Sequence, residues 1–169
     1  MAAIQIQTPR LALFPLTEAQ LHLYLDASAL ETQLGLTVSQ RQISEELRDA
    51  IENTLIPSAQ EHNSSPFYTL WTAVDKSSNA MVGDITLIAN SDSEEEIEIG
   101  YGTYEQHQNK GYMTEIIAGI LDWLETQNTF SSVIATTAET NYPSHKVLIK
   151  NRFYTADVEN GLIFWRRLL

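Results

Sequence analysis

Alternation of apolar and polar residues, the period expected of a β-strand, dominates two early parts of the chain. The segment "RLALFPLT" (10–17) predicts a strand that ends at Pro15 to Thr17. Between residues 67 and 104, the runs "FYTLWTAVD", "MVGDITLIA" and "EEIEIGYGTY" are separated by the turn-rich segments "KSSNA" and "NSDSE". We therefore expect an antiparallel meander of three strands in the middle of the chain.

Helical spacing of apolar residues marks two segments between the first strand and the meander. "TEAQ" at 17–20 has the spacing of a capping box, and leucines follow it at roughly helical intervals as far as Leu30. "SQRQ" at 39–42 is a second capping box, and Pro57 is expected to end the helix that it opens. The apolar face of this second, stronger helix comprises Ile43, Leu47, Ile51 and Leu55.

The period changes from two to 3.6 after Gly111, which predicts a helix as far as about Gln127. Its apolar stripe comprises Met113, Ile116, Ile117, Ile120, Leu121 and Leu124. "SSVIATTAE" (131–139) predicts another strand, Asn141 with Pro143 begins a short helix, and "FYTADVENGLIFWRRLL" predicts a closing hairpin about "ENG". The predicted order is β-α-α-β-β-β-α-β-α-β-β, an α/β domain that spans residues 1–169 without an internal repeat or linker.

Composition narrows the possible functions. A chain of 169 residues with 43% apolar content is long enough for one core, and the absence of cysteine excludes disulfides, thiolate metal sites and a cysteine nucleophile. The four histidines lack ligand spacing, so we expect no metal site. No apolar run is long enough to span a membrane and no signal peptide is evident, so we expect a cytoplasmic protein without a membrane partner.

The net charge of −12 argues against nucleic acid as a partner, because phosphate contacts require a positive face. The charge is also unevenly distributed. Residues 141–169 contain five basic and two acidic residues, a net charge of +3, so the remaining 140 residues carry −15. Such a chain could attract an anion at one place and a cation at another, although solvation alone also accounts for surface charge.

The segment "QNKGYMTE" (108–115) places a glycine where a polar loop meets the predicted helix. Glycine allows a close approach of the backbone to a bound group, and the free N–H groups of a first helical turn attract anions. The same residue also serves ordinary tight turns, so the segment alone leaves both possibilities open. It matches neither the Walker pattern nor the three-glycine dinucleotide fingerprint.

Three ordered motifs resemble the GNAT superfamily of acyl-CoA-dependent N-acyltransferases, and in particular its RimJ/RimL-like branch. "EIGYGTYEQHQNKGYMTEIIAGILDWL" is similar to the central motif of the superfamily, whose pyrophosphate loop reads Arg/Gln-x-x-Gly-x-Gly/Ala; here it falls on Gln108, Gly111 and, as a departure, Met113. "TPRLAL" (8–13) and "NYPSHKVLIKNRF" (141–153) resemble the flanking motifs of the branch. The resemblance implies a mixed, mostly antiparallel sheet with helices on both faces, splayed between the fourth and fifth predicted strands.

The resemblance also implies acetyl-CoA as cosubstrate and a primary amine as acceptor, either a small molecule or a protein N-terminus. It assigns pantetheine binding to the main chain of the strand end, Gly102, Thr103 and Tyr104. Asn141 and Ser144 match positions near the pantetheine and the thioester sulfur. Pyrophosphate binding is assigned to the loop residues Gln108, Asn109, Lys110, Gly111, Tyr112, Met113 and Thr114.

Two positions depart from the pattern of the superfamily. Leu148 stands where many members have a tyrosine that protonates the departing thiolate, so Ser144 or water becomes the expected donor. Arg152 replaces the usual glycine before Phe153, which puts the local turn in question.

The transfer itself requires a neutral amine near the thioester carbonyl and a route for its proton. Because the chain has no cysteine, we expect direct transfer in a ternary complex. Glu98 lies nearest the splay on the polar face of "EEEIEIGY" and is the candidate base, through water, with a solvated strand end as the alternative. Solvated side chains are the expectation for Glu94, Glu95 and Glu96.

Some questions stay open at this point. A diverged CoA-binding or regulatory module without transferase activity is the alternative function, since the expected tyrosine is absent. The acidic part of the chain, including the "SDSEEEIE" rim (91–98), could concentrate a cationic acceptor or could serve only solubility. The identity of the acceptor, and whether the protein is a monomer or a homodimer, are not predicted.

Overall fold

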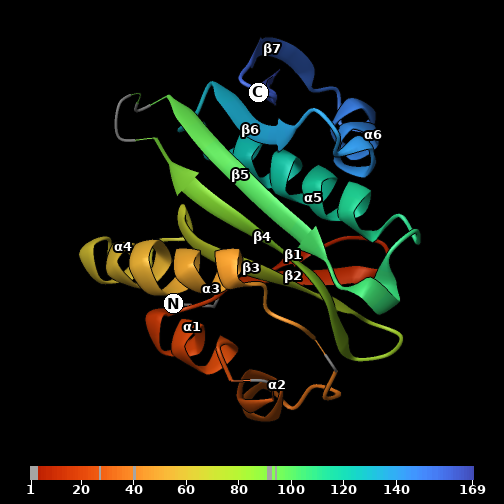
Figure 1. Cartoon of the computed structure of the whole chain (residues 1–169). Coiled ribbons are helices and arrows are strands. Elements are labelled where there is room, and N and C mark those ends of the chain that lie inside the picture. The colour runs from red at the N-terminus through yellow and green to blue at the C-terminus, as the bar shows by residue number, and fades with distance from the viewer. Residues whose placement is uncertain (1–3, 27, 40, 91–92, 94) are drawn as a thin grey trace.

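A computed structural model of the chain describes residues 4–26, 28–39, 41–90, 93 and 95–169. The strands form one sheet in the order β1-β2-β3-β4-β5-β6-β8-β7 (Figure 1). Neighbouring strands are antiparallel except for β5 and β6, which are parallel. The meander β3-β4-β5 is therefore confirmed, as is the mixed, mostly antiparallel sheet. The strands are β1 (Ile6–Gln7), β2 (Leu11–Pro15), β3 (Tyr68–Asp75), β4 (Ala80–Ala89), β5 (Glu96–Thr103), β6 (Ser132–Ala138), β7 (Tyr154–Glu159) and β8 (Leu162–Leu168).

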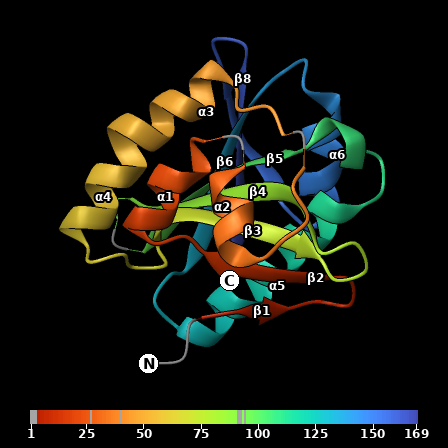
Figure 2. The same cartoon turned by 90° about the horizontal axis from the view of Figure 1, so that it is seen from below.

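Helices cover both faces of the sheet, as predicted. Figures 1 and 2 show α1 to α4 on one side and α5 on the other, and the two buried clusters divide in the same way. None of the helices in the described ranges combines the length and the apolar content that crossing a membrane requires. The helical elements are α1 (Glu18–Tyr24), α2 (Ala29–Leu34), α3 (Glu45–Ala50), the π-helical turn η1 (Ile51–Leu55), α4 (Ile56–Glu61), the 3₁₀ turn η2 (Glu105–His107), α5 (Tyr112–Gln127) and α6 (Tyr142–Lys150).

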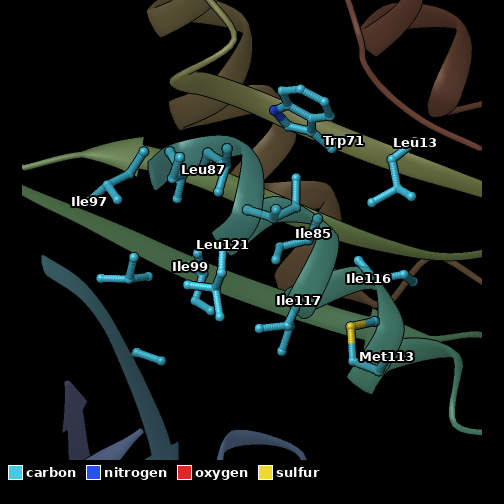
Figure 3. Packing of buried hydrophobic residues seen from close by; sticks show 14 of the residues in the cluster. Leu13, Trp71, Ile85, Leu87, Ile97, Ile99, Met113, Ile116, Ile117 and Leu121 are labelled. Atoms are coloured by element: carbon cyan, nitrogen blue, oxygen red, sulfur yellow. The ribbon is translucent and has the colours of Figure 1, made fainter. Parts of the chain in front are cut away.

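The apolar stripe of α5 forms the centre of the larger core, as its period predicted. Figure 3 shows Met113, Ile116 and Ile117 in the same buried cluster as the sheet residues Ile85 and Ile99. Burial of each such side chain stabilises the fold by about 1.5–3 kcal/mol. This packing fixes the position of α5, and with it the position of the loop that precedes its first turn.

The sheet opens between β5 and β6. The two strands pair only from Glu96 to Glu98, where Glu98 lies opposite Ile134. Beyond this point β5 continues to Thr103 beside β4 alone, while β6 continues to Ala138 beside β8. One edge of β5 is consequently left without a strand partner, which confirms the predicted splay.

The predicted start of the second helix was wrong. α3 begins after Ser44, whose hydroxyl accepts a hydrogen bond from the Leu47 N–H, rather than after Ser39. Gln40 of the predicted capping box lies outside the described residues, and the Ser39 hydroxyl instead lies 3.4 Å from Glu31 Oε1. Ser39 has the full capping-box spacing, with Gln42 three residues later, whereas Ser44 has Leu47 at that position, so the local pattern favoured the wrong serine.

Pro57 does not end this helix, contrary to the prediction. The π-helical turn η1 precedes it, with the Ile56 N–H bonded to the Ile51 carbonyl five residues earlier. Proline lacks an N–H and crowds the preceding turn, and the wider π turn accommodates it so that α4 continues to Glu61. Two further differences are the short strand β1, which was not predicted, and the division of the first helix into α1 and α2.

The two C-terminal turns depend on left-handed backbone. In the hairpin β7-β8, Asn160 and Gly161 both have positive φ (53° and 78°), which fits the expected turn about "ENG". Arg152 adopts φ 63° after α6, so the chain keeps the left-handed turn even though arginine has replaced glycine. The Phe153 N–H closes this turn on the Leu148 carbonyl, 3.1 Å away.

Candidate active site

A cavity of about 630 Å³ lies between the end of β5, the start of α5 and the start of α6. Most of the residues predicted from the sequence to bind acetyl-CoA line it together, although they come from three separate segments. They are Gly102, Thr103, Gln108, Asn109, Gly111, Tyr112, Met113, Thr114, Asn141 and Ser144. Lys110 and Tyr104 are not among its lining residues. We call this space the cofactor cavity.

The loop before α5 presents free backbone donors to this cavity. Asn109 and Gly111 have left-handed backbone (φ 60° and 75°), and Gly111 forms the N-cap of α5 without a side-chain capping bond. Within the described chain, no backbone N–H from Asn109 to Thr114 donates a hydrogen bond to another residue. Unbonded N–H groups at the start of a 16-residue helix form a site for an anion such as pyrophosphate.

A clasp from the N-terminal motif holds the loop in place. The Thr8 hydroxyl donates to Glu115 Oε1 (2.6 Å), and Arg10 Nε donates to Glu115 Oε2 (2.6 Å). Arg10 Nη1 donates to the Lys110 carbonyl (2.9 Å), and the guanidinium carbon lies 4.6 Å from the centre of the Tyr112 ring. Hydrogen bonds from Thr8 and Arg10 hold the pKa of Glu115 below its usual value against partial burial, which raises it. The conformation of the loop thus depends on residues about 100 positions earlier.

The free edge of β5 supplies further main-chain groups. Glu96 and Tyr104 form backbone hydrogen bonds to Asn90 and Val82, at the two ends of β4. In an antiparallel pair alternate residues bond to the partner strand, so Tyr101 and Thr103 direct their N–H and C=O groups to the opposite, free edge. Of the three residues assigned to pantetheine from the sequence, Thr103 faces the free edge, whereas the Tyr104 N–H is already bonded to Val82.

The start of α6 forms the opposite wall of the cofactor cavity. Asn141 caps the helix by accepting a hydrogen bond from the Ser144 N–H (3.3 Å). The Tyr101 hydroxyl donates to the Ser144 carbonyl (3.4 Å), and burial raises the pKa of Tyr101 to about 12, so the phenol stays protonated. Lys146 and Lys150 also line the cavity and provide positive charge near the free N–H groups.

A second cavity, of about 490 Å³, lies on the other side of β5, beneath α3. Tyr101, Gly102 and Thr103 line both cavities, so the end of β5 is the wall that they share. The residues that line the second cavity include the acidic Glu46, Asp84 and Glu105 and no lysine or arginine. We call it the acceptor cavity.

Glu98 lies on the acceptor side of the sheet, on the same face as Gly100 and Gly102. Its side chain is exposed, and it lines neither cavity. Glu96, on the same face, is bonded instead to Arg166 (2.6 Å). The described residues of the acidic rim, 93 and 95–98, do not line the acceptor cavity, and Ser91, Asp92 and Glu94 lie outside the described residues.

Sequence reasoning missed a buried polar cluster at the floor of the acceptor cavity. Asp84 of β4 accepts hydrogen bonds from the hydroxyls of Tyr24 and Tyr104. A signal was present, because Asp84 is the only charged residue of "MVGDITLIA", and a charge within an apolar strand is rarely buried without a reason. Its partner on α1 lies 60 positions away, and no local pattern connects the two.

Comparison with known protein families gives a match to the acetyltransferase (GNAT) domain over residues 10–154. A curated relative, the uncharacterized N-acetyltransferase YjdG of Bacillus subtilis, is 29% identical over 93 residues. That alignment covers 55% of this chain and only 55% of the length of the relative.

Solved structures show the same fold at low sequence identity. An acetyltransferase from Salmonella typhimurium, described as modifying the N-terminal serine of the 50S ribosomal subunit protein L7/L12, has a TM-score of 0.67 at 17% identity, with 98% of this chain and 99% of that chain covered. The ribosomal L7/L12 alpha-N-protein acetyltransferase RimL in complex with coenzyme A has a TM-score of 0.66 at 19% identity, with 98% of each chain covered.

Proposed function

Since the chain belongs to the acetyltransferase (GNAT) domain family, we propose that it transfers an acetyl group from acetyl-CoA to a primary amine in a ternary complex. The acceptor is a protein N-terminus or a small cationic amine. The 169 residues act as one acetyltransferase domain. The observation that carries the proposal is the run of unbonded N–H groups from Asn109 to Thr114, which opens on a cavity that shares the end of β5 with a second cavity.

The residues of the cofactor cavity fit a CoA group. The free N–H groups at the start of α5, with Lys146 and Lys150 nearby, suit the negative charge of a pyrophosphate. The free edge of β5 suits the amide groups of a pantetheine arm, which pairs with main-chain groups as another strand would. Acetyl-CoA supplies the activated acyl carbon. The chain supplies position, a proton acceptor and a donor for the leaving thiolate.

Glu98 is the proposed proton acceptor, acting through water. It occupies the last position at which β5 is paired on both sides, so its backbone is fixed next to the opening of the sheet. Its exposed side chain leaves space for a water molecule on the face where Gly100 and Gly102 lack side chains. Ser144 is the proposed donor toward the thiolate, since Leu148 is completely buried and has no group to donate.

A panel of primary amines tested for thiol release from acetyl-CoA decides between transfer and the alternative, a CoA-binding module. Thiol release that requires both acetyl-CoA and an amine supports the transferase. Binding of CoA by calorimetry without thiol release from any amine or peptide would favour the module instead.

Removal of the Ser144 hydroxyl should reduce turnover. We expect Ser144→Ala to lower kcat roughly tenfold or more while leaving CoA affinity unchanged, because a thiolate donor acts only in the transition state. Tyr101→Phe is the comparison, since the Tyr101 hydroxyl contacts the Ser144 carbonyl from the adjacent wall. If kcat were normal in Ser144→Ala and greatly reduced in Tyr101→Phe, Tyr101 rather than Ser144 would be the proton donor to the thiolate.

The charge of the acceptor cavity predicts a salt effect. The three carboxylates of this cavity, within a protein of net charge −12, should attract a cationic amine. We expect kcat/KM for a cationic amine to fall markedly between about 20 and about 300 mM salt, while the value for a neutral amine stays flat. Flat profiles for both amines would mean that the acidic surface has no part in selecting the substrate.

A further inference from the structure

The carboxylate of Asp84 lies at the floor of the acceptor cavity and is buried, with only 5% of the residue exposed. Its Oδ2 accepts hydrogen bonds from Tyr24 (2.5 Å) and Tyr104 (2.7 Å). Within the described part of the chain, neither its Oδ1 nor the hydroxyl of Thr72, which lies opposite on β3, forms a hydrogen bond of standard geometry, although this hydroxyl is close enough to lower the pKa of Asp84. One oxygen of the carboxylate is thus held by two tyrosines, and the other has only the Thr72 hydroxyl nearby.

No cation of the described chain pairs with this carboxylate. The nearest candidate, Arg41, is bonded to Glu31 (3.0 Å) in a completely buried ion pair, and its guanidinium carbon lies 4.0 Å from the centre of the Tyr24 ring. Burial raises the pKa of Asp84 to about 6, opposed by hydrogen bonds from Tyr24, Tyr104 and Thr72 and by the charge of Arg41, so the group is still mostly ionised at neutral pH. Arg41 acts on Asp84 only through its charge, and a buried carboxylate without a direct ion pair favours a ligand that brings a cation to it.

The tyrosines keep this carboxylate in one orientation. Burial, and then the negative charge of Asp84, raises the pKa of both Tyr24 and Tyr104, so both hydroxyls remain protonated donors. They come from α1 and from the end of β5, and Arg41 packs against Tyr24 from the loop before α3. Three separate segments therefore fix the position of one carboxylate, as a preformed binding site requires.

The position of Asp84 separates it from the reacting centre. It lies on β4 opposite Gly102, whereas the free edge of β5 lies on the far side of that strand. Strands are spaced about 4.8 Å apart, so a thioester at the free edge is about two spacings from the backbone of Asp84. A group at Asp84 is too distant to be the amine that attacks. Gly102 lies between the two positions, and a Cβ added there would meet no atom within 4 Å.

We propose that Asp84 binds a second cationic group of the acceptor, so that the preferred substrate carries a positive charge several bonds away from the amine that is acetylated. This inference rests on the proposed function and specifies its substrate class. The attacking amine lies at the free edge of β5, and the second ammonium lies at the acceptor-cavity floor over Asp84. Glu46 and Glu105 add negative charge along the same cavity. A diamine or polyamine has this form, and so does a peptide N-terminus that is followed by lysine.

The variant Asp84→Asn tests the proposal, because it removes the charge and keeps an acceptor for both tyrosines. We expect kcat/KM for 1,3-diaminopropane and spermidine to fall about tenfold or more, the usual scale for a lost hydrogen bond to a charged group, while the value for propylamine changes less than about twofold. Asp122→Asn, on the outer face of α5, is the matched control and should behave as the wild type. Equal losses for diamine and monoamine, or no loss for either, would overturn the proposal.

Two further measurements separate this inference from the proposed function. Calorimetric binding of spermidine to the CoA-saturated protein requires no turnover, and it should be lost in Asp84→Asn while CoA affinity is kept. Equal binding of spermidine to both proteins would refute the role of Asp84, whether or not thiol is released. The same conclusion would follow if the wild type bound neither spermidine nor the lysine-containing peptide Ser-Lys-Ala. A peptide Ser-Lys-Ala compared with Ser-Gln-Ala in the same assays distinguishes a protein acceptor from a polyamine. If the asparagine variant does not fold, Asp84→Thr, a strand-forming neutral replacement, gives the same comparison.

Discussion

Gly111→Val is expected to abolish measurable binding of CoA while the protein remains folded. Gly111 adopts φ 75° at the N-cap of α5, and the N–H groups on both sides of it are unbonded. A left-handed conformation costs an ordinary residue about 1–2 kcal/mol, and a β-branched side chain tolerates it least, so the loop must change its path. The free energy of unfolding of a domain, about 5–15 kcal/mol, exceeds that cost, so the protein stays folded. The changed path of the loop, however, moves the N–H groups out of the arrangement that binds an anion.

Gly161→Val is the matched control for this experiment. Gly161 has nearly the same backbone angle, φ 78°, and a Cβ added there meets nothing within 4 Å. It lies in the β7-β8 hairpin and lines neither cavity. The two variants therefore share the backbone strain and differ in position. Calorimetry should show CoA binding in Gly161→Val and none in Gly111→Val, with circular dichroism similar for both. Unaltered CoA affinity in Gly111→Val would remove the loop from the binding site.

The parts of the fold that were predicted correctly are those in which local period and burial agree. In α5 every residue of the predicted stripe, from Met113 to Leu124, is buried, because one face of this 16-residue helix packs on the sheet. The strands β3, β4 and β5 were likewise located within one or two residues. In long periodic segments of this kind, tertiary contacts rarely change the secondary structure that the sequence pattern predicts.

The errors occurred where the folded chain overrode a local signal or where no local signal existed. Ser39 has the full capping-box pattern with Gln42, yet it lies beside Glu31, and Ser44 caps α3 instead. The helix was predicted to end at Pro57 because proline interrupts a regular α-helix, and the local sequence does not show the π turn that accommodates it. β1 has only two residues and exists through its pairing with β2, so it has no period to detect.

The same distinction applies to the candidate active site. Gly111 and Asn141 each belong to a motif of contiguous residues, and the resemblance of these two motifs located both sides of the cofactor cavity. The clasp of Arg10 on Glu115 and the bonds of Tyr24 to Asp84 connect segments 105 and 60 positions apart. Only the folded chain brings these groups together, so charge and spacing along the sequence could not reveal them.

Two carboxylates on the face of the sheet directed at the acceptor cavity, Asp84 of β4 and Glu98 of β5, are candidates for acid–base work, and geometry separates their roles. Asp84 is buried on β4, and one of its oxygens is occupied by two tyrosines. Glu98 is exposed and lies where β5 and β6 part, so water can reach both it and the opening of the sheet. A proton acceptor that returns its proton to solvent after each cycle needs such access, and Glu98 has it.

Glu98→Gln is therefore expected to lower kcat about 100-fold or more and to leave the affinity for acetyl-CoA unchanged, since loss of a general base affects the transition state and not the bound cosubstrate. Glu96→Gln is the matched control: it lies on the same face of the same strand, but its carboxylate is bonded to Arg166 and to the Ser132 hydroxyl. That variant should lose some stability and retain turnover. Steady-state rates and CoA calorimetry on both variants decide the matter. Full activity in Glu98→Gln would leave solvent as the base, and equal losses in both variants would indicate a general effect of the charge on β5 rather than proton transfer at Glu98.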